Sequence, residues 1–169
     1  MSSIEKNYKL TVSLLLVIFI FGIGAKISED VSIDFNILEE GPGAAVVDIQ
    51  PGLAVFTEEG EYIDYYKQIH RTKHPKPLPP YIDFNKSIAL FISFGEQKSA
   101  GYFIEIRKVY RRDSTLVIKA ILRKPPQDSF QAQVITHPYN LIVVPVGDYR
   151  RIELVDEIGE VQDFKTLKM

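Results

Sequence analysis

The strand predicted at residues 88–94 limits the possible folds of this chain more than any other stretch. Side chains alternate between two faces along a strand, and here both faces are largely apolar. One face carries Ile88, Leu90, Ile92 and Phe94, and the other carries Ala89, Phe91 and Ser93. A strand of this kind needs cover on both sides, so we expect it at the centre of a sheet that lies between other layers.

Short alternating runs and turn signals dominate the remainder of the sequence. Residues 102–107 and 116–123 predict an antiparallel hairpin around the polar turn at 111–114. We also expect residues 81–109 to form a central hairpin, with strands at 88–94 and from Tyr102 on either side of a polar loop. Further strands are predicted at residues 32–39, 44–49, 53–56, 131–135, 140–146 and 149–155, with 160–167 as an edge strand or a frayed tail. Turn signals at intervals of roughly ten residues favour a mainly β fold (β-rich α+β), either an antiparallel sandwich or a partly closed barrel.

One helix is predicted, at residues 57–71. Apolar and aromatic residues recur there at three- and four-residue spacing and so share one face: Tyr62, Ile63, Tyr66 and Ile69. Thr57 is the expected N-cap, followed by acidic residues that favour the positive end of a helix. The proline-rich segment 74–81 then predicts an extended connector, either a strap across the surface or a ligand for an aromatic groove of a partner.

The N-terminal segment, residues 1–26, has the pattern of an export signal or of an uncleaved membrane anchor. Residues 10–25 carry no charge, lysines flank them, and small residues stand at Gly22, Gly24 and Ala25. At ~1.5 Å per residue the run spans about 24 Å as a helix, shorter than the roughly 30 Å hydrocarbon core of a bilayer. The signal and the anchor both place residues 27–169, which we expect to form one domain, outside the cytoplasm in a bacterial envelope. A buried helix of the domain is the third alternative for this run, and it does not imply export.

Composition and motifs predict no catalytic chemistry. The net charge is -2, which gives no general attraction for nucleic acid, and the absence of cysteine removes disulfides and thiolate chemistry. His70 and His74 have the spacing of a zinc pair on a helix, but no third ligand is indicated, so exposed histidines at a helix end are expected instead. We therefore predict no catalytic residue, no metal and no cofactor.

Residues 83–146 carry a series of separated motifs: Asp83-Phe84, a glycine-rich loop and strand, and a Thr-x-Pro-Tyr ending. Their other positions are Gly95, Gly101, Tyr102, Ile104, Ile106, Pro125, Pro126, Thr136, Pro138, Tyr139 and Pro145. In these positions the segment resembles the PrcB C-terminal-like family, named for a bacterial accessory protein that stabilises a cell-surface protease complex. Ser99 and Ala100 replace the usual Thr-Gly, and the lipid-attachment cysteine of many members is missing. If the family's loop needs a positive φ at this position, Ala100 would strain it.

This resemblance implies a non-enzymatic envelope protein that binds or stabilises a protein partner, with a surface or periplasmic protease as one such partner. The N-terminal segment would add a membrane contact if it stays attached. Loops on a rigid β scaffold commonly carry binding. The candidate contact residues are Lys98, Ser99, Ala100, Gly101, Tyr102, His137, Pro138 and Tyr139.

Two alternatives remain open at this stage. The Ser-Ala-Gly-Tyr loop at 99–102 is similar to the loop of chagasin-type cysteine-protease inhibitors, which implies a protease inhibitor. The other alternative is a hydrolase of unknown type, which would need titratable residues gathered in a pocket. A purely structural role for Gly101 and Tyr102, in shaping the turn, also remains open.

Overall fold

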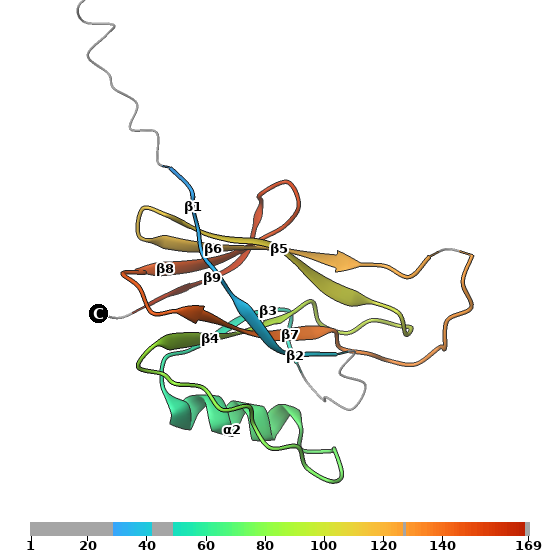
Figure 1. Cartoon of the computed structure of the whole chain (residues 1–169). Coiled ribbons are helices and arrows are strands. Elements are labelled where there is room, and N and C mark those ends of the chain that lie inside the picture. The colour runs from blue at the N-terminus through green and yellow to red at the C-terminus, as the bar shows by residue number, and fades with distance from the viewer. Residues whose placement is uncertain (1–28, 42–48, 127, 168–169) are drawn as a thin grey trace, which may run out of the picture.

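The domain is built from three layers, two β-sheets and one helix (Figure 1). The computed structural model describes residues 29–41, 49–126 and 128–167. The predicted sandwich is confirmed, and the sheets in this described part do not close into a barrel. The expected N-terminal signal or anchor and nearly all of the strand expected at 44–49 lie outside the described residues. Within those residues, no helix is both long enough and apolar enough to span a bilayer.

The middle layer is a four-stranded antiparallel sheet, and β4 (Ser87–Ser93) lies inside it. Its order is β2 (Asn36–Gly41), β7 (Tyr139–Pro145), β4 and β3 (Gly52–Phe56). Ile88, Leu90 and Ile92 pack into the core between the two sheets. Ala89 and Phe91 pack on the opposite face, against the layer formed by helix α2 (Glu59–Ile69). The prediction of a strand covered on both sides is therefore confirmed.

The outer sheet has five strands in the order β1, β5, β6, β8, β9. Its hairpin of β5 (Phe103–Arg112) and β6 (Thr115–Arg123) was predicted correctly. Of the two alternatives for residues 160–167, the structure has the edge strand, β9 (Val161–Thr166). The expectation of purely antiparallel pairing is wrong, because β8 (Arg151–Val155) runs parallel to β6. After β6 the chain forms β7 in the other sheet and then returns, and such a crossover allows parallel pairing.

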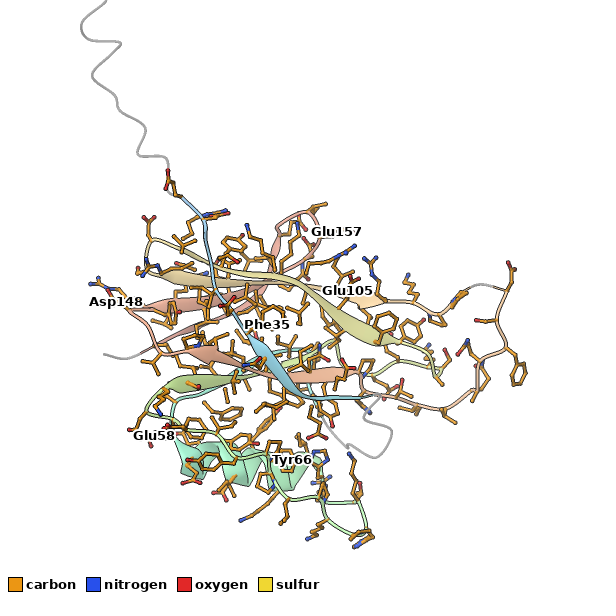
Figure 2. The ribbon with its side chains drawn as sticks, viewed as in Figure 1. Phe35, Glu58, Tyr66, Glu105, Asp148 and Glu157 are labelled. Atoms are coloured by element: carbon orange, nitrogen blue, oxygen red, sulfur yellow. The ribbon has the colours of Figure 1, made fainter. Side chains whose placement is uncertain are left out.

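Two expected strands and one expected hairpin are wrong. Residues 32–39 form two strands in different sheets: β1 (Val31–Ser32) pairs with β5, and β2 pairs with β7. Phe35 lies between them at the crossing from sheet to sheet, packed on the core (Figure 2). Residues 131–135 form no strand, and only a bridge between Gln97 and Thr136 is present there. β4 and β5 do not pair with each other, because they belong to different sheets.

Helix α2 closes the outer face of the four-stranded sheet. Its buried residues are Tyr62, Tyr66 and Ile69, as the helical spacing predicted. The predicted cap is wrong, because Glu58 occupies the N-cap position and no side chain caps the helix. The proline-rich segment is an irregular connector, as expected, and the Tyr62 hydroxyl donates a hydrogen bond to the Pro80 carbonyl at 3.1 Å.

Replacing Leu90 by Ala tests whether the two-sided burial of β4 stabilises the fold. Leu90 has no exposed surface, so the change should lower the free energy of unfolding by about 2–5 kcal/mol. Chemical denaturation measures this difference. The matched control is Leu78→Ala, because Leu78 is 89% exposed and its loss should cost almost nothing. Equal effects of the two changes would contradict this account of the core.

Candidate functional site

The candidate site is a group of loops at one end of the sandwich, which we call the loop cluster (residues 95–102, 124–126 and 128–138). Figure 1 shows these loops extending together beyond the sheets. Gln97 and Thr136 join two of them through a pair of backbone hydrogen bonds, of 2.7 Å and 2.9 Å. The Ala100 N–H donates to the Ala132 carbonyl at 2.9 Å, and the buried Thr136 hydroxyl donates to the Ser99 carbonyl at 3.0 Å. The loops therefore form one hydrogen-bonded unit.

Gly101 is the residue whose backbone the loop cluster constrains most. Its φ is +89°, a conformation that penalises a side chain. A Cβ at this position would lie 2.4 Å from Gln131 Oε1 and 2.9 Å from Pro125 Cβ. Ala100 is not among the non-glycine residues with positive φ, so the departure from the family pattern does not strain the loop.

The predicted contact residues differ widely in exposure. Lys98 and Gly101 are exposed, whereas Ser99, Ala100, Tyr102 and His137 are half-buried. Pro138 and Tyr139 are buried, so they support the loops from beneath and present little surface to a partner. The structure thus brings the predicted residues together, and whether they bind a partner stays a prediction.

Sequence reasoning missed the most exposed apolar residues at this end of the domain, which we call the apolar set. They are Phe103, Phe130, Val134 and Ile135, with exposed fractions of 57%, 98%, 46% and 57%. Residues 131–135 were expected to form a strand, which would have buried every second side chain. Residues 131–135 form no strand because no neighbouring strand pairs with them in the described structure. The sequence carries no signal for this, because strand pairing depends on the tertiary fold.

A cleft of about 480 Å³ opens beside the loop cluster, between the two sheets. Across it, the buried Asn140 side chain on β7 donates to the Ile104 carbonyl on β5 at 3.2 Å. This bond ties the sheets together where they diverge. The cleft is lined by Glu40, Gly41, Gly101, Tyr102, Phe103, Ile104, Tyr139 and Asn140.

Glu39 on β2 is the centre of a polar network behind the cleft. Its carboxylate accepts hydrogen bonds from the Tyr66 hydroxyl, at 2.8 Å, and from the Tyr139 hydroxyl. Tyr66 projects from α2 toward the sheet (Figure 2), so the network joins β2, β7 and the helix. Burial raises the pKa of both tyrosines, and the bond to Glu39 raises it further, which keeps these hydroxyls protonated as donors.

His70 also belongs to this network, and the expectation that it would be exposed is wrong. Its side chain is 2% exposed, and its ring lies 4.3 Å from that of Tyr66. Its Nε2 is 3.4 Å from Glu39 Oε1, which is an ion-pair distance and too long for an ordinary N–H···O bond. Neither ring nitrogen has a hydrogen-bond partner within the described residues.

Burial lowers the pKa of His70 below its usual 6.5, and the charge of Lys73 lowers it further, whereas the nearby Glu39 carboxylate opposes them. His74 lies on the exposed connector, and no group of three or more potential metal-binding side chains occurs among the described residues. The neutral form of His70 is thus the one that the folded state favours.

Replacing Gly101 by Ala should destabilise the domain by about 1–3 kcal/mol, because the new Cβ meets both an unfavourable φ and a close neighbour. Thermal or chemical unfolding measures the loss. Gly159→Ala is the matched control, since Gly159 has a φ of +93° but nothing within 4 Å of the added Cβ. The cost at Gly101 should exceed that at Gly159, and the reverse order would show that the loops do not pack as described.

His70 predicts a loss of stability in mild acid. Because its folded-state pKa lies below 6.5, the unfolded chain binds more protons once the pH falls below about 6.5, and unfolding becomes easier. His70→Phe should therefore flatten the profile of unfolding free energy below about pH 6.5. His74→Gln is the control and should keep the wild-type slope. An unchanged slope in the His70 variant would exclude this residue as its source.

Comparison with known proteins adds one finding. Residues 88–145 match the family model described as PrcB C-terminal. No curated protein and no solved structure matches the chain. The matched span runs from β4 to β7, so it contains strands of both sheets and the whole loop cluster, although it covers less than half of the chain. Residues 88–145 are therefore similar to the PrcB C-terminal family, which confirms over this span the resemblance seen in the sequence.

Proposed function

We propose that this protein is a non-enzymatic accessory module that binds a protein partner through the loop cluster. The observation that carries the proposal is the apolar set, whose side chains are exposed on the hydrogen-bonded loops and, for Phe103, at the start of β5. Scattered single apolar residues are normal on protein surfaces, but a concentration in one place is typical of an interaction site. The family match supports an accessory role of the PrcB type, and a surface or periplasmic protease is the class of partner that this family suggests.

Preorganisation favours binding at this site. A partner that docks on a free loop must order it, and the lost chain entropy weakens the complex. Here the bonds from Gln97, Ala100 and Thr136 already fix the loops in the unbound domain. The remaining cost is mainly the immobilisation of side chains such as Phe130, which is 98% exposed.

The arrangement of the domain suits attachment through the N-terminus. β1 pairs with Tyr110 and Arg111 near the end of β5, whereas the loop cluster joins the start of β5 at Phe103. β1 thus lies at one end of the sandwich, and the loop cluster lies at the other (Figure 1). We propose that residues 1–26 direct the chain out of the cytoplasm or hold it at the inner membrane, with the loop cluster directed away from the bilayer.

The protease-inhibitor alternative receives less support than docking. It requires the loop at 99–102 to enter an active site, yet Ser99 and Ala100 are half-buried against Thr136 and Ala132. The more accessible residues lie in the neighbouring loop, and the chagasin-like string does not include them. Docking through the apolar set therefore accounts better for what is exposed.

A crosslinking experiment in intact envelopes tests the proposed function. A photo-reactive residue at Lys98 should capture one dominant partner, and the double variant Phe130→Ser/Ile135→Ser should reduce capture about tenfold, because exposed apolar anchors supply most of the binding energy. The matched control is Ile158→Ser, which changes an 81% exposed residue in the turn between β8 and β9. The proposal fails if the double variant captures as much as the wild type, or if the Ile158 change reduces capture equally.

A further inference from the structure

β5 has an unpaired edge along its first half. β1 covers only Tyr110 and Arg111, and the Ile33 N–H adds one bond to the Val109 carbonyl at 2.9 Å. The chain then crosses to the other sheet through Phe35. In the part of the chain that the structure describes, no strand pairs with β5 between Phe103 and Arg107 on this side.

The hydrogen-bonding groups on this edge can be assigned from the bonds that are made. The N–H and C=O of one residue point to the same side of an antiparallel strand, and the direction alternates along it. The Ile104 carbonyl turns away from β6, because it accepts the bond from Asn140. The Ile106 N–H and C=O and the Ile104 N–H therefore face the open edge.

The irregularity farther along β5 supports this assignment. The pairing of β5 with β6 shifts by one residue between Ile106 and Lys108, so Arg107 is an extra residue. Before Arg107, the backbone groups that point away from β6 belong to even-numbered residues, and after it they belong to odd-numbered residues. The bond from the Ile33 N–H to the Val109 carbonyl agrees with this change. The open edge thus ends at the bulge, where β1 begins its cover.

The side chains beside this edge are mainly apolar. Tyr102, Phe103 and Ile104 line the cleft together with Tyr139. Phe103 is also 57% exposed to solvent. The charges nearby on β5 are already satisfied, since Glu105 pairs with Arg107 at 2.8 Å and with Arg123 at 2.5 Å. Backbone groups and apolar surface, rather than charge, are what this edge offers a ligand.

We propose that an extended segment of the partner protein adds to the β5 edge as a short strand, and that one of its apolar side chains enters the cleft. This inference rests on the proposed function and names the binding mode at the same end of the domain. The segment is short, about five residues, because the bulge at Arg107 and the cover by β1 limit the free edge. Hydrogen bonds between the backbone of the partner segment and the backbone of Ile104 and Ile106 supply affinity. The cleft supplies specificity for the apolar side chain that enters it.

The geometry favours a peptide over a compact small molecule. The cleft volume of about 480 Å³ falls within the roughly 300–1,000 Å³ typical of ligand pockets. The volume alone therefore does not distinguish a peptide from a small molecule. Its wall, however, is the edge of a strand with unpaired backbone groups at alternate residues. An extended chain matches that repeat along its whole length, and it also reaches Phe103 at the border of the loop cluster.

The probe is a set of peptides selected from a random eight-residue display library on the purified full-length protein in detergent. A selected synthetic peptide should slow hydrogen exchange at the Ile104 and Ile106 amides. N-methylation of alternate peptide amides should lower affinity at least about tenfold in one frame, the one facing β5, and leave the other frame nearly unchanged. Ile106→Pro removes an N–H that faces the open edge, so it should also lower the affinity for the peptide at least about tenfold. This comparison requires that the variant and the wild type have the same midpoint of chemical denaturation.

The outcomes separate this inference from the proposed function. If no peptide is selected, or if bound peptides leave both amides unprotected and tolerate N-methylation in either frame, strand addition is wrong. Peptides that bind without protecting these amides could still lose affinity for the Phe130→Ser/Ile135→Ser variant. In that case the loop cluster binds proteins by another mode, and only the further inference fails. If the envelope crosslinking also finds no partner, both fail.

Discussion

The burial of β4 on both faces is the constraint on which the rest of the structure depends. Its Ile88–Leu90–Ile92 face requires a second sheet, and its Ala89–Phe91 face requires the tyrosine-rich side of α2. Neither cover can be omitted, because an exposed apolar face would cost roughly 25 cal/mol for each Å² left in water. The three layers follow from this one strand, and the Glu39 network then fixes the helix to β2 and β7 through hydrogen bonds.

The loop cluster is a consequence of the same arrangement. Since β4 and β5 belong to different sheets, the segment that joins them must cross the end of the sandwich. The connection from β6 to β7 crosses at the same end, and the paired backbones of Gln97 and Thr136 hold the two crossings together. The early departure of the chain from β1 to β2 leaves the β5 edge beside them without a partner strand among the described residues. One end of the domain thereby collects apolar loops, a cleft and unpaired strand groups.

Local pattern in the sequence was sufficient for β4, for the β5–β6 hairpin and for the buried face of α2, because each depends on its own periodicity. It was insufficient for the parallel pairing of β8 and for the division of residues 32–39 between two sheets, because these depend on which strands meet in space. His70 was expected at the surface because it ends a helix, yet the packing of β7 against that end buries it. At the candidate site, the Gly101 loop was identified from its motif, whereas Phe130 and Ile135 carry no local pattern that marks them as exposed.

The central claim is that the loop cluster is a preorganised surface, and native-state hydrogen exchange tests it most directly. The amides of Gln97, Ala100 and Thr136 donate to carbonyls of a neighbouring loop. Our account predicts that these three amides exchange far more slowly than an unstructured chain, and that Gly101→Ala accelerates them together. Exchange of all three at the rate of a free loop, while the amides of β4 stay protected, would contradict the claim.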